Sequence, residues 1–98
     1  METQATITEW AKSVGIKPDI LRAVMRAKEE MDEALVDISR GDIAAAGVEL
    51  ADVVICLHVA ASLMGVDLQA AIDTKMQINR NRTWRVDATG CAYHVKTA

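Results

Sequence analysis

The sequence predicts an all-α fold, a small helical bundle that is completed by dimerisation. Apolar residues recur at the spacing of an α-helix along most of the chain, and no segment alternates between apolar and polar residues. Glycines at positions expected to end helices divide this pattern into separate segments. Of the 98 residues, 51% are hydrophobic, which is more than a small monomer easily buries. Association through helix faces is therefore expected.

The first two helices are expected to precede residue 41. Thr6-x-x-Glu9 has the form of a capping box, and the short helix that follows ends at Gly15. Pro18 fits the first turn of a second helix that runs to Arg40 and ends at the next glycine. One apolar stripe is expected on this second helix, and its acidic residues 29, 30 and 33 lie outside that stripe. The stripe consists of Ile20, Val24, Ala27, Met31, Leu35 and Ile38.

The third helix is expected to be capped by Asp42 and to end at Gly65. Asp67 is expected to cap a fourth helix that runs to about Arg82, and residues 83–98, with Gly90 and no periodicity, form an ordered or half-ordered tail. The whole chain is interpreted as a single domain over residues 1–98. Its helical core is assigned to residues 16–84 and its C-terminal tail to residues 85–98.

The overall charge and composition argue against two classes of partner. The net charge of −3, with no compensating basic stripe, argues against nucleic acid. The apolar third helix is long enough to cross a membrane, but Glu49, Asp52 and His58 lie inside it. Each of these side chains would cost about 2.5 kcal/mol or more at the centre of a bilayer. With no signal peptide at the N-terminus, a soluble cytoplasmic protein is expected.

Two pairs of acidic residues with the same spacing are the strongest functional signal, Glu30-x-x-Glu33 and Glu49-x-x-Asp52. The second pair lies in the apolar helix, where a carboxylate must find a cation or lose much hydration energy. If the two pairs face each other, they form an oxygen-lined site for Mg²⁺. Two alternatives stay open: the buried pair could be neutralised by Arg or Lys, and the acids of the second helix could simply face solvent.

The fourth helix carries a complementary basic signal. Lys75, Asn79 and Arg82 continue one stripe of this helix after two apolar residues. Lys and Arg can hold phosphate oxygens, and Asn can reach a sugar or a base. The alternative is a solvated helix end whose basic residues complement the helix dipole.

These motifs together resemble those of the MazG-type family of all-α nucleotide pyrophosphohydrolases. The resemblance runs from about Arg26 to Trp84 through Glu29-Glu30-x-x-Glu33, Glu49-x-x-Asp52 and Lys75-x-x-x-Asn79-x-x-Arg82-x-Trp84. It implies a homodimer or homotetramer in which helices of two subunits pack together. It also implies hydrolysis of a nucleoside triphosphate to the monophosphate and pyrophosphate with Mg²⁺, or with Mn²⁺ in its place.

The resemblance also assigns roles to individual residues. Glu29 would be the base that activates the attacking water. The metal ligands would be Glu30, Glu33, Glu49 and Asp52, and the substrate-binding residues would be Lys75, Asn79 and Arg82, with Trp10 and Trp84 as weaker assignments.

By resemblance alone the substrate is a deoxynucleotide, with the pyrimidines dCTP and dUTP as first guesses. Two alternatives remain: an enzyme similar to phosphoribosyl-ATP pyrophosphohydrolase, and a non-catalytic helical dimer that binds a nucleotide or another protein.

Overall fold

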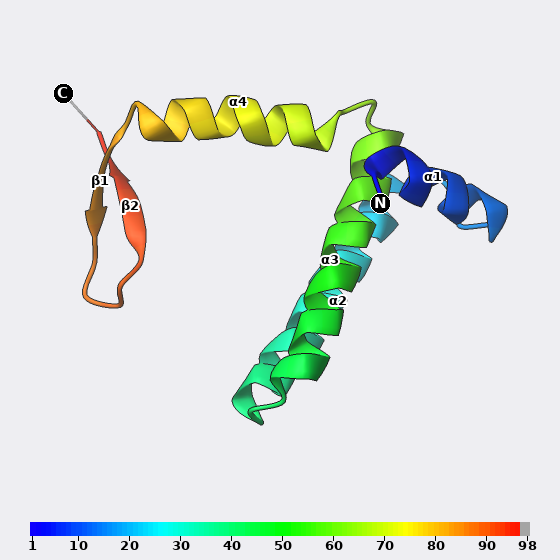
Figure 1. The fold of residues 1–98 in the computed structure, drawn as a ribbon, viewed down its shortest axis with the longest axis horizontal. Helices are drawn as coiled ribbons and strands as arrows, with labels where there is room; N and C mark the ends of the chain where they lie inside the picture. Colours follow the sequence, from blue (N-terminus) through cyan, green and yellow to red (C-terminus); the bar gives the residue numbers. More distant parts are fainter. Residues whose placement is uncertain (97–98) are drawn as a thin grey trace. The chain divides into compact units, whose positions relative to one another are not determined.

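The structure, a computed structural model, describes residues 1–96 of the chain. Its elements follow the order α1 (Gln4–Ser13), α2 (Ile20–Ser39), α3 (Ile43–Leu63), α4 (Leu68–Arg80), β1 (Thr83–Val86) and β2 (Ala92–Val95) (Figure 1). The expectation of a mostly helical fold is confirmed, whereas the expectation of a chain without strands is wrong. The chain divides into two compact units, Met1–Leu68 and the part from Gln69 onward.

The first unit is built on the pair α2 and α3, which pack side by side along their length (Figure 1). Their contact is made largely by small side chains, because Ala27 and Ala34 of α2 and Ala46 and Ala60 of α3 are all buried. Small residues allow two helices to approach closely. This close approach brings the polar side chains at the same interface within reach of one another.

The helix ends follow known capping rules, with two corrections. Helix α1 begins one turn earlier than expected, because Thr3 rather than Thr6 is its N-cap and Thr6 closes the capping box from the third helical position. Helix α2 is capped by Asp19, whose carboxylate accepts the backbone N–H of Arg22, so Pro18 lies before the cap. Helix α3 begins after Asp42 as expected.

Helix α1 is attached to the C-terminal end of α3 by a polar cluster around Gln4. The Gln4 amide donates hydrogen bonds to Ser62 Oγ at 3.1 Å and to the carbonyl of Val66 at 2.7 Å, and its oxygen accepts the backbone N–H of Leu68 at 2.9 Å. The same oxygen lies 3.4 Å from Nδ1 of the half-buried His58. These contacts fix the position of α1 over α3.

The second unit contains α4 and an antiparallel hairpin in which β1 pairs with β2 from Thr83 opposite Val95 to Val86 opposite Ala92. Asp87 organises the hairpin loop, because its Oδ1 accepts hydrogen bonds from the backbone and hydroxyl of Thr89 and from the backbone of Cys91. Gly90 in this loop has a φ of +86°, a conformation that glycine adopts without strain. Of the ordered or half-ordered tail that was expected from residue 83, the described part is therefore an ordered hairpin.

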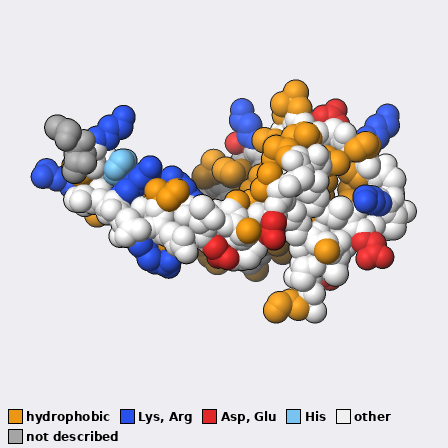
Figure 2. Space-filling model, turned by 90° about the horizontal axis from the view of Figure 1, so that it is seen from above, with side chains coloured by type: hydrophobic (Ala, Val, Ile, Leu, Met, Phe, Trp, Pro, Cys, Tyr) orange, Lys and Arg blue, Asp and Glu red, His pale blue; other side chains and the backbone are white. Residues whose placement is uncertain are grey.

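Much apolar surface remains exposed. On α2 the expected apolar stripe is largely uncovered: Val24, Met31, Leu35 and Ile38 are 43% to 62% exposed, and of that stripe Ala27 is buried. Figure 2 shows hydrophobic side chains at the surface of the molecule. By length and composition alone α3 could cross a membrane, a property that core helices of soluble proteins share.

Candidate functional site

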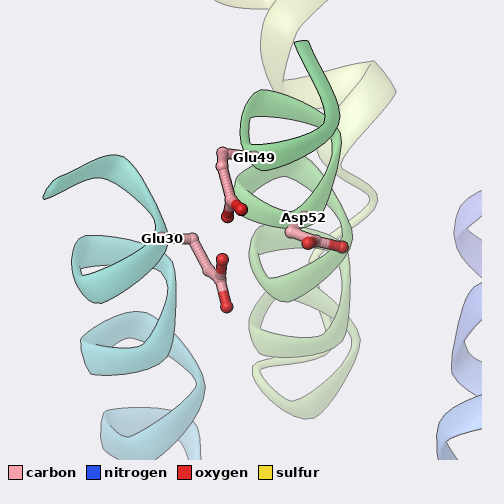
Figure 3. Close-up of side chains that lie close together, drawn as sticks. All are labelled: Glu30, Glu49 and Asp52. Carbon is pink, nitrogen blue, oxygen red and sulfur yellow. The ribbon is translucent and has the colours of Figure 1, made fainter. Parts of the chain in front are cut away.

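Three of the four predicted metal ligands meet at the interface of α2 and α3. Glu30 extends from α2 towards Glu49 and Asp52 of α3 (Figure 3), and one carboxylate oxygen from each lies within 4.8 Å of the others. Glu30 is 4% exposed, and the other two are half-buried. Such a set of hard oxygen ligands could hold a divalent metal ion.

The burial of Glu30 corrects the expected orientation of α2. The side of α2 that packs against α3 contains Ala27, Glu30 and Ala34, which are spaced three and four residues apart. The interface is therefore rotated from the apolar stripe towards the acidic arc. The small side chains of Ala27 and Ala34 leave room on either side of Glu30. Its carboxylate can therefore be buried next to the carboxyl groups of Glu49 and Asp52.

Glu33, the fourth predicted ligand, adjoins this cluster. Its side chain is exposed, but its carboxyl group hydrogen-bonds with those of Glu30 and Glu49. All four predicted ligands are therefore neighbours, with Glu33 at the solvent side.

The cluster holds Glu49 in an unusual protonation state. The pKa of Glu49 is raised to about 7. The hydrogen bond with Glu30 contributes most to this rise, followed by burial and by the hydrogen bond with Glu33. The hydrogen bond with Glu49, together with the charge of Arg26, lowers the pKa of Glu30. A proton on Glu49 thus stabilises the ionised Glu30. Within residues 1–96, no N–H or hydroxyl group donates a hydrogen bond to the buried Oε2 of Glu49, so a cation could bind this oxygen.

Glu29, the predicted base, lies between two arginines on the same side of α2. Its carboxylate accepts hydrogen bonds from Arg26 Nη1 at 3.0 Å and Arg22 Nη1 at 3.3 Å, and the bond from Arg26 is the main reason why the pKa of Glu29 is lowered. Arg26 Nη2 also pairs with Glu30. Arginine therefore neutralises part of the cluster at Glu30, and not at the Glu49–Asp52 pair for which the sequence left this alternative open. In residues 1–96, no arginine or lysine forms an ion pair with Glu49 or Asp52.

A cavity of about 530 Å³ opens beside the cluster within the first unit. Glu30 and Asp52 line it together with Trp10, which was predicted to bind substrate. Its volume lies in the range typical of small-molecule sites. Its apolar lining includes Ile16, Ile55 and Val59, and its basic lining consists of Lys17, Arg22 and Arg26.

Sequence reasoning did not assign the two arginines to the site, although a signal was present. Arg22, Arg26 and Glu30 follow one another at four-residue spacing, which places them on one side of α2. Lys17 and the half-buried Cys56 also line the cavity. Neither of these two residues belongs to a recognisable motif, so only the folded structure could reveal them.

The remaining predicted substrate residues, Lys75, Asn79, Arg82 and Trp84, belong to the second unit. Trp84 Nε1 donates to the carbonyl of Asn79 at 2.7 Å, and the Trp84 ring lies 6.0 Å from that of His94. The amide oxygen of Asn79 is buried and has no hydrogen-bond partner among residues 1–96. Arg82 lies beyond the end of α4, in the turn before β1, and not on the helical stripe as expected.

Comparison with known proteins identifies the family to which this arrangement belongs. No family model matches the chain. The dATP/dGTP diphosphohydrolase of Cyanophage S-2L is 32% identical over 94 residues, which cover 96% of this chain and 86% of that protein. A structure of the Cyanophage S-2L MazG-like pyrophosphohydrolase superimposes with a TM-score of 0.75 at 29% identity, over 95% of this chain and 93% of that one. The chain belongs to the MazG-like pyrophosphohydrolase family.

Membership of the MazG-like family confirms the expected enzyme class, a hydrolase that acts on nucleotide phosphoanhydrides. The S-2L MazG-like enzyme was solved with dGDP and three catalytic Mn²⁺ ions per active site. A dATP/dGTP diphosphohydrolase of Salmonella phage PMBT28 is 33% identical over 94 residues. The chain spans 31% of the length of that relative.

Proposed function

We propose that this MazG-like protein hydrolyses a purine deoxynucleoside triphosphate to the monophosphate and pyrophosphate with the help of Mg²⁺ or Mn²⁺. The observation that carries the proposal is the convergence of Glu30, Glu49 and Asp52, from two helices, beside a cavity of nucleotide size. The names of both phage relatives support a purine deoxynucleotide. They favour purines over the pyrimidines suggested by the sequence.

The proposed metal ligands are Glu30, Glu33, Glu49 and Asp52. Their chemistry fits a hard divalent cation, because all are carboxylates and one buried oxygen of Glu49 accepts no hydrogen bond from an N–H or hydroxyl group in the described part of the chain. These carboxylates would hold Mg²⁺ or Mn²⁺, which would supply positive charge to neutralise the phosphates and the leaving pyrophosphate. Glu49 would release its proton on metal binding, because a carboxylate must be ionised to act as a ligand.

Residues of the chain would provide the rest of the reaction. Glu29 remains ionised at neutral pH because Arg26 lowers its pKa, and we assign it the role of accepting a proton from the water that attacks the α-phosphorus. Trp10, in the cavity lining, would contact the base. Lys75, Asn79, Arg82 and Trp84 of the second unit are proposed as further substrate contacts.

We also propose that the protein assembles as a homodimer or homotetramer. The exposed apolar stripe of α2 supports this, since a soluble protein rarely leaves such a row of large side chains uncovered. The family relationship implies a soluble protein, and we propose that it acts in the cytoplasm.

The decisive experiment is a panel of ribo- and deoxynucleoside triphosphates with Mg²⁺ or Mn²⁺, in which released pyrophosphate and orthophosphate are measured separately. We expect pyrophosphate from dATP or dGTP. Glu49→Gln should lower turnover at least a hundredfold, because it removes a ligand charge, whereas Glu9→Gln, a matched change at an exposed position of α1, should leave it unchanged. Release of orthophosphate and a diphosphate would contradict the assigned bond, and unaltered turnover in Glu49→Gln would remove the site.

A further inference from the structure

The charged residues that line the cavity are arranged in order along α2. Asp19, Arg22, Arg26 and Glu30 follow one another at three- and four-residue spacing, and all line the cavity. At 1.5 Å per residue this row spans about 16 Å. One end of the row lies at the carboxylate cluster with Asp52. The two arginines occupy the middle of the row, between Glu30 at one end and Asp19 at the other.

The opposite wall has the matching order. Helix α3 returns alongside α2 after a short loop, so Asp52 faces the acidic end and Val59, two turns later, lies towards the end of α3 to which α1 is attached. Trp10 of α1 also lines the cavity. The cavity thus has an acidic end at Glu30 and Asp52 and a basic middle. At its other end apolar residues lie together with the charged Lys17 and Asp19. A nucleotide has the same order of parts if its phosphates approach the metal ligands and its base approaches Trp10.

The two arginines are held at the cavity by Glu29. Two positive side chains one turn apart on a helix repel each other, and the carboxylate of Glu29 bonds to both. Their side chains nevertheless remain 62% and 49% exposed. A guanidinium has five N–H donors, and the ion pairs within the first unit engage only one nitrogen of Arg22 and two of Arg26. Donors therefore remain for a ligand in the cavity.

We infer that Arg22 and Arg26 bind the phosphate groups of the substrate in this cavity, an inference that rests on the proposed function. The planar guanidinium matches the oxygens of a phosphate and forms strong charge-assisted bonds with them. A triphosphate with a divalent cation still carries negative charge, which two arginines would balance. Because Glu29 already restrains both side chains, little conformational entropy would be lost when their remaining N–H donors bind phosphate oxygens.

The test measures binding, not turnover. The probes are the α,β-imido analogue of dGTP, which cannot release pyrophosphate, and 2′-deoxyguanosine, which has no phosphate, each titrated in the presence of Mn²⁺. We expect Arg22→Gln and Arg26→Gln each to weaken binding of the analogue about tenfold or more, the scale of one charge-assisted hydrogen bond. Binding of deoxyguanosine should stay unchanged. Arg26→Lys should bind the analogue more tightly than Arg26→Gln but more weakly than the wild type, because lysine keeps the positive charge and lacks the paired N–H donors of the guanidinium.

Lys28→Gln is the matched control, since it removes a positive charge from the same helix at an exposed position outside the cavity lining. An effect of the arginine variants no larger than that of Lys28→Gln would overturn the inference, as would an equal loss for both probes, which would indicate a general change of the cavity. If Arg26→Gln does not fold, Arg22→Gln and Arg26→Lys carry the test. Wild-type protein that neither binds the analogue nor releases pyrophosphate would contradict the proposed function itself.

Discussion

Glu49 differs from the other acids of the site in the proton that it keeps. Glu29 and Glu30 have lowered pKa values because arginine and hydrogen-bond donors stabilise their ionised forms, whereas Glu49 lies next to two other carboxyls and forms no ion pair with a cationic side chain of residues 1–96. Its pKa of about 7 therefore lies inside the range in which enzymes are assayed. Without a metal ion, Glu30 and Glu49 therefore share a proton, which a divalent ion would have to displace.

The stability of the metal-free protein should depend on this proton. The pKa of Glu49 is about 7 in the folded protein and 4.5 ordinarily, so the folded state binds the proton more tightly than the unfolded state. The stabilising contribution is fully present below pH 4.5 and is lost as the pH rises through 7. With a chelator present, we expect a lower free energy of unfolding at pH 8 than at pH 5.5, measured by urea denaturation. Glu49→Gln should remove this difference, and an unchanged difference in the variant would assign it to another group.

Metal binding should show the opposite dependence on pH. Because a proton must leave Glu49, Mn²⁺ should bind more weakly as the pH falls below 7, and binding at pH 6 should release more protons than binding at pH 8. Calorimetric titration with Mn²⁺ in two buffers of different ionisation enthalpy measures the released protons. Equal proton release at both pH values would contradict the assignment of the shared proton to Glu49.

The sequence identified the acidic residues of the cluster, but it did not predict which of them are buried or which face of α2 packs against α3. The two equally spaced pairs, 30 with 33 and 49 with 52, predicted that the four acids lie together, and carboxylate oxygens of Glu30, Glu49 and Asp52 do lie within 4.8 Å of one another. The burial of Glu30 was not predictable from periodicity, because an apolar stripe normally marks the buried face. That stripe is exposed here, and the small side chains of Ala27 and Ala34 determine the packing instead.

At the scale of single elements, local chemistry predicted where most helices begin and end. Asp42 and the glycines after α2 and α3 have short-range roles, so their effect could be recognised in sequence. The cap of α1 was misplaced because threonine can take the role of glutamate in a capping box. The hairpin was missed because its strands have four residues each, too few for an alternating pattern to stand out.

The N-cap of α3 offers a direct test of this local chemistry. Asp42 accepts the backbone N–H of Ala45 at 3.1 Å, so Asp42→Ala leaves that donor without its partner. We expect the free energy of unfolding to fall by about 1 kcal/mol, measured by urea denaturation. Asp32→Ala, at an exposed position within α2, should cause little change. A loss of equal size in both variants would contradict a specific capping role.

At the scale of the whole molecule, the core of the first unit is small and consists mainly of alanine and valine. Larger apolar side chains, Leu35 and Leu21 among them, are 62% and 70% exposed. A single copy of the chain therefore leaves much of its hydrophobic surface in contact with water. Burial of that surface against a second copy would supply stability that this core lacks.

Disruption of the apolar stripe of α2 should therefore dissociate the protein. Leu35→Glu places a charge in the middle of the proposed interface, and we expect a shift to the mass of a monomer in size-exclusion chromatography with light scattering. Lys28→Glu introduces a negative charge on the same helix outside the stripe, and it should keep the wild-type mass. Wild-type protein that runs as a monomer would exclude the assembly, and an unchanged mass for Leu35→Glu would place the interface elsewhere.

Gln4 has a consequence for how nucleotide selectivity could change in this family. One amide holds α1 against the end of α3, and α1 supplies the tryptophan that lines the cavity away from the carboxylates. Substitution at this remote attachment point could reshape the compartment for the base while every acid stays in place. Substitutions at position 4 could therefore change the preferred nucleobase while the acidic residues proposed for hydrolysis stay the same.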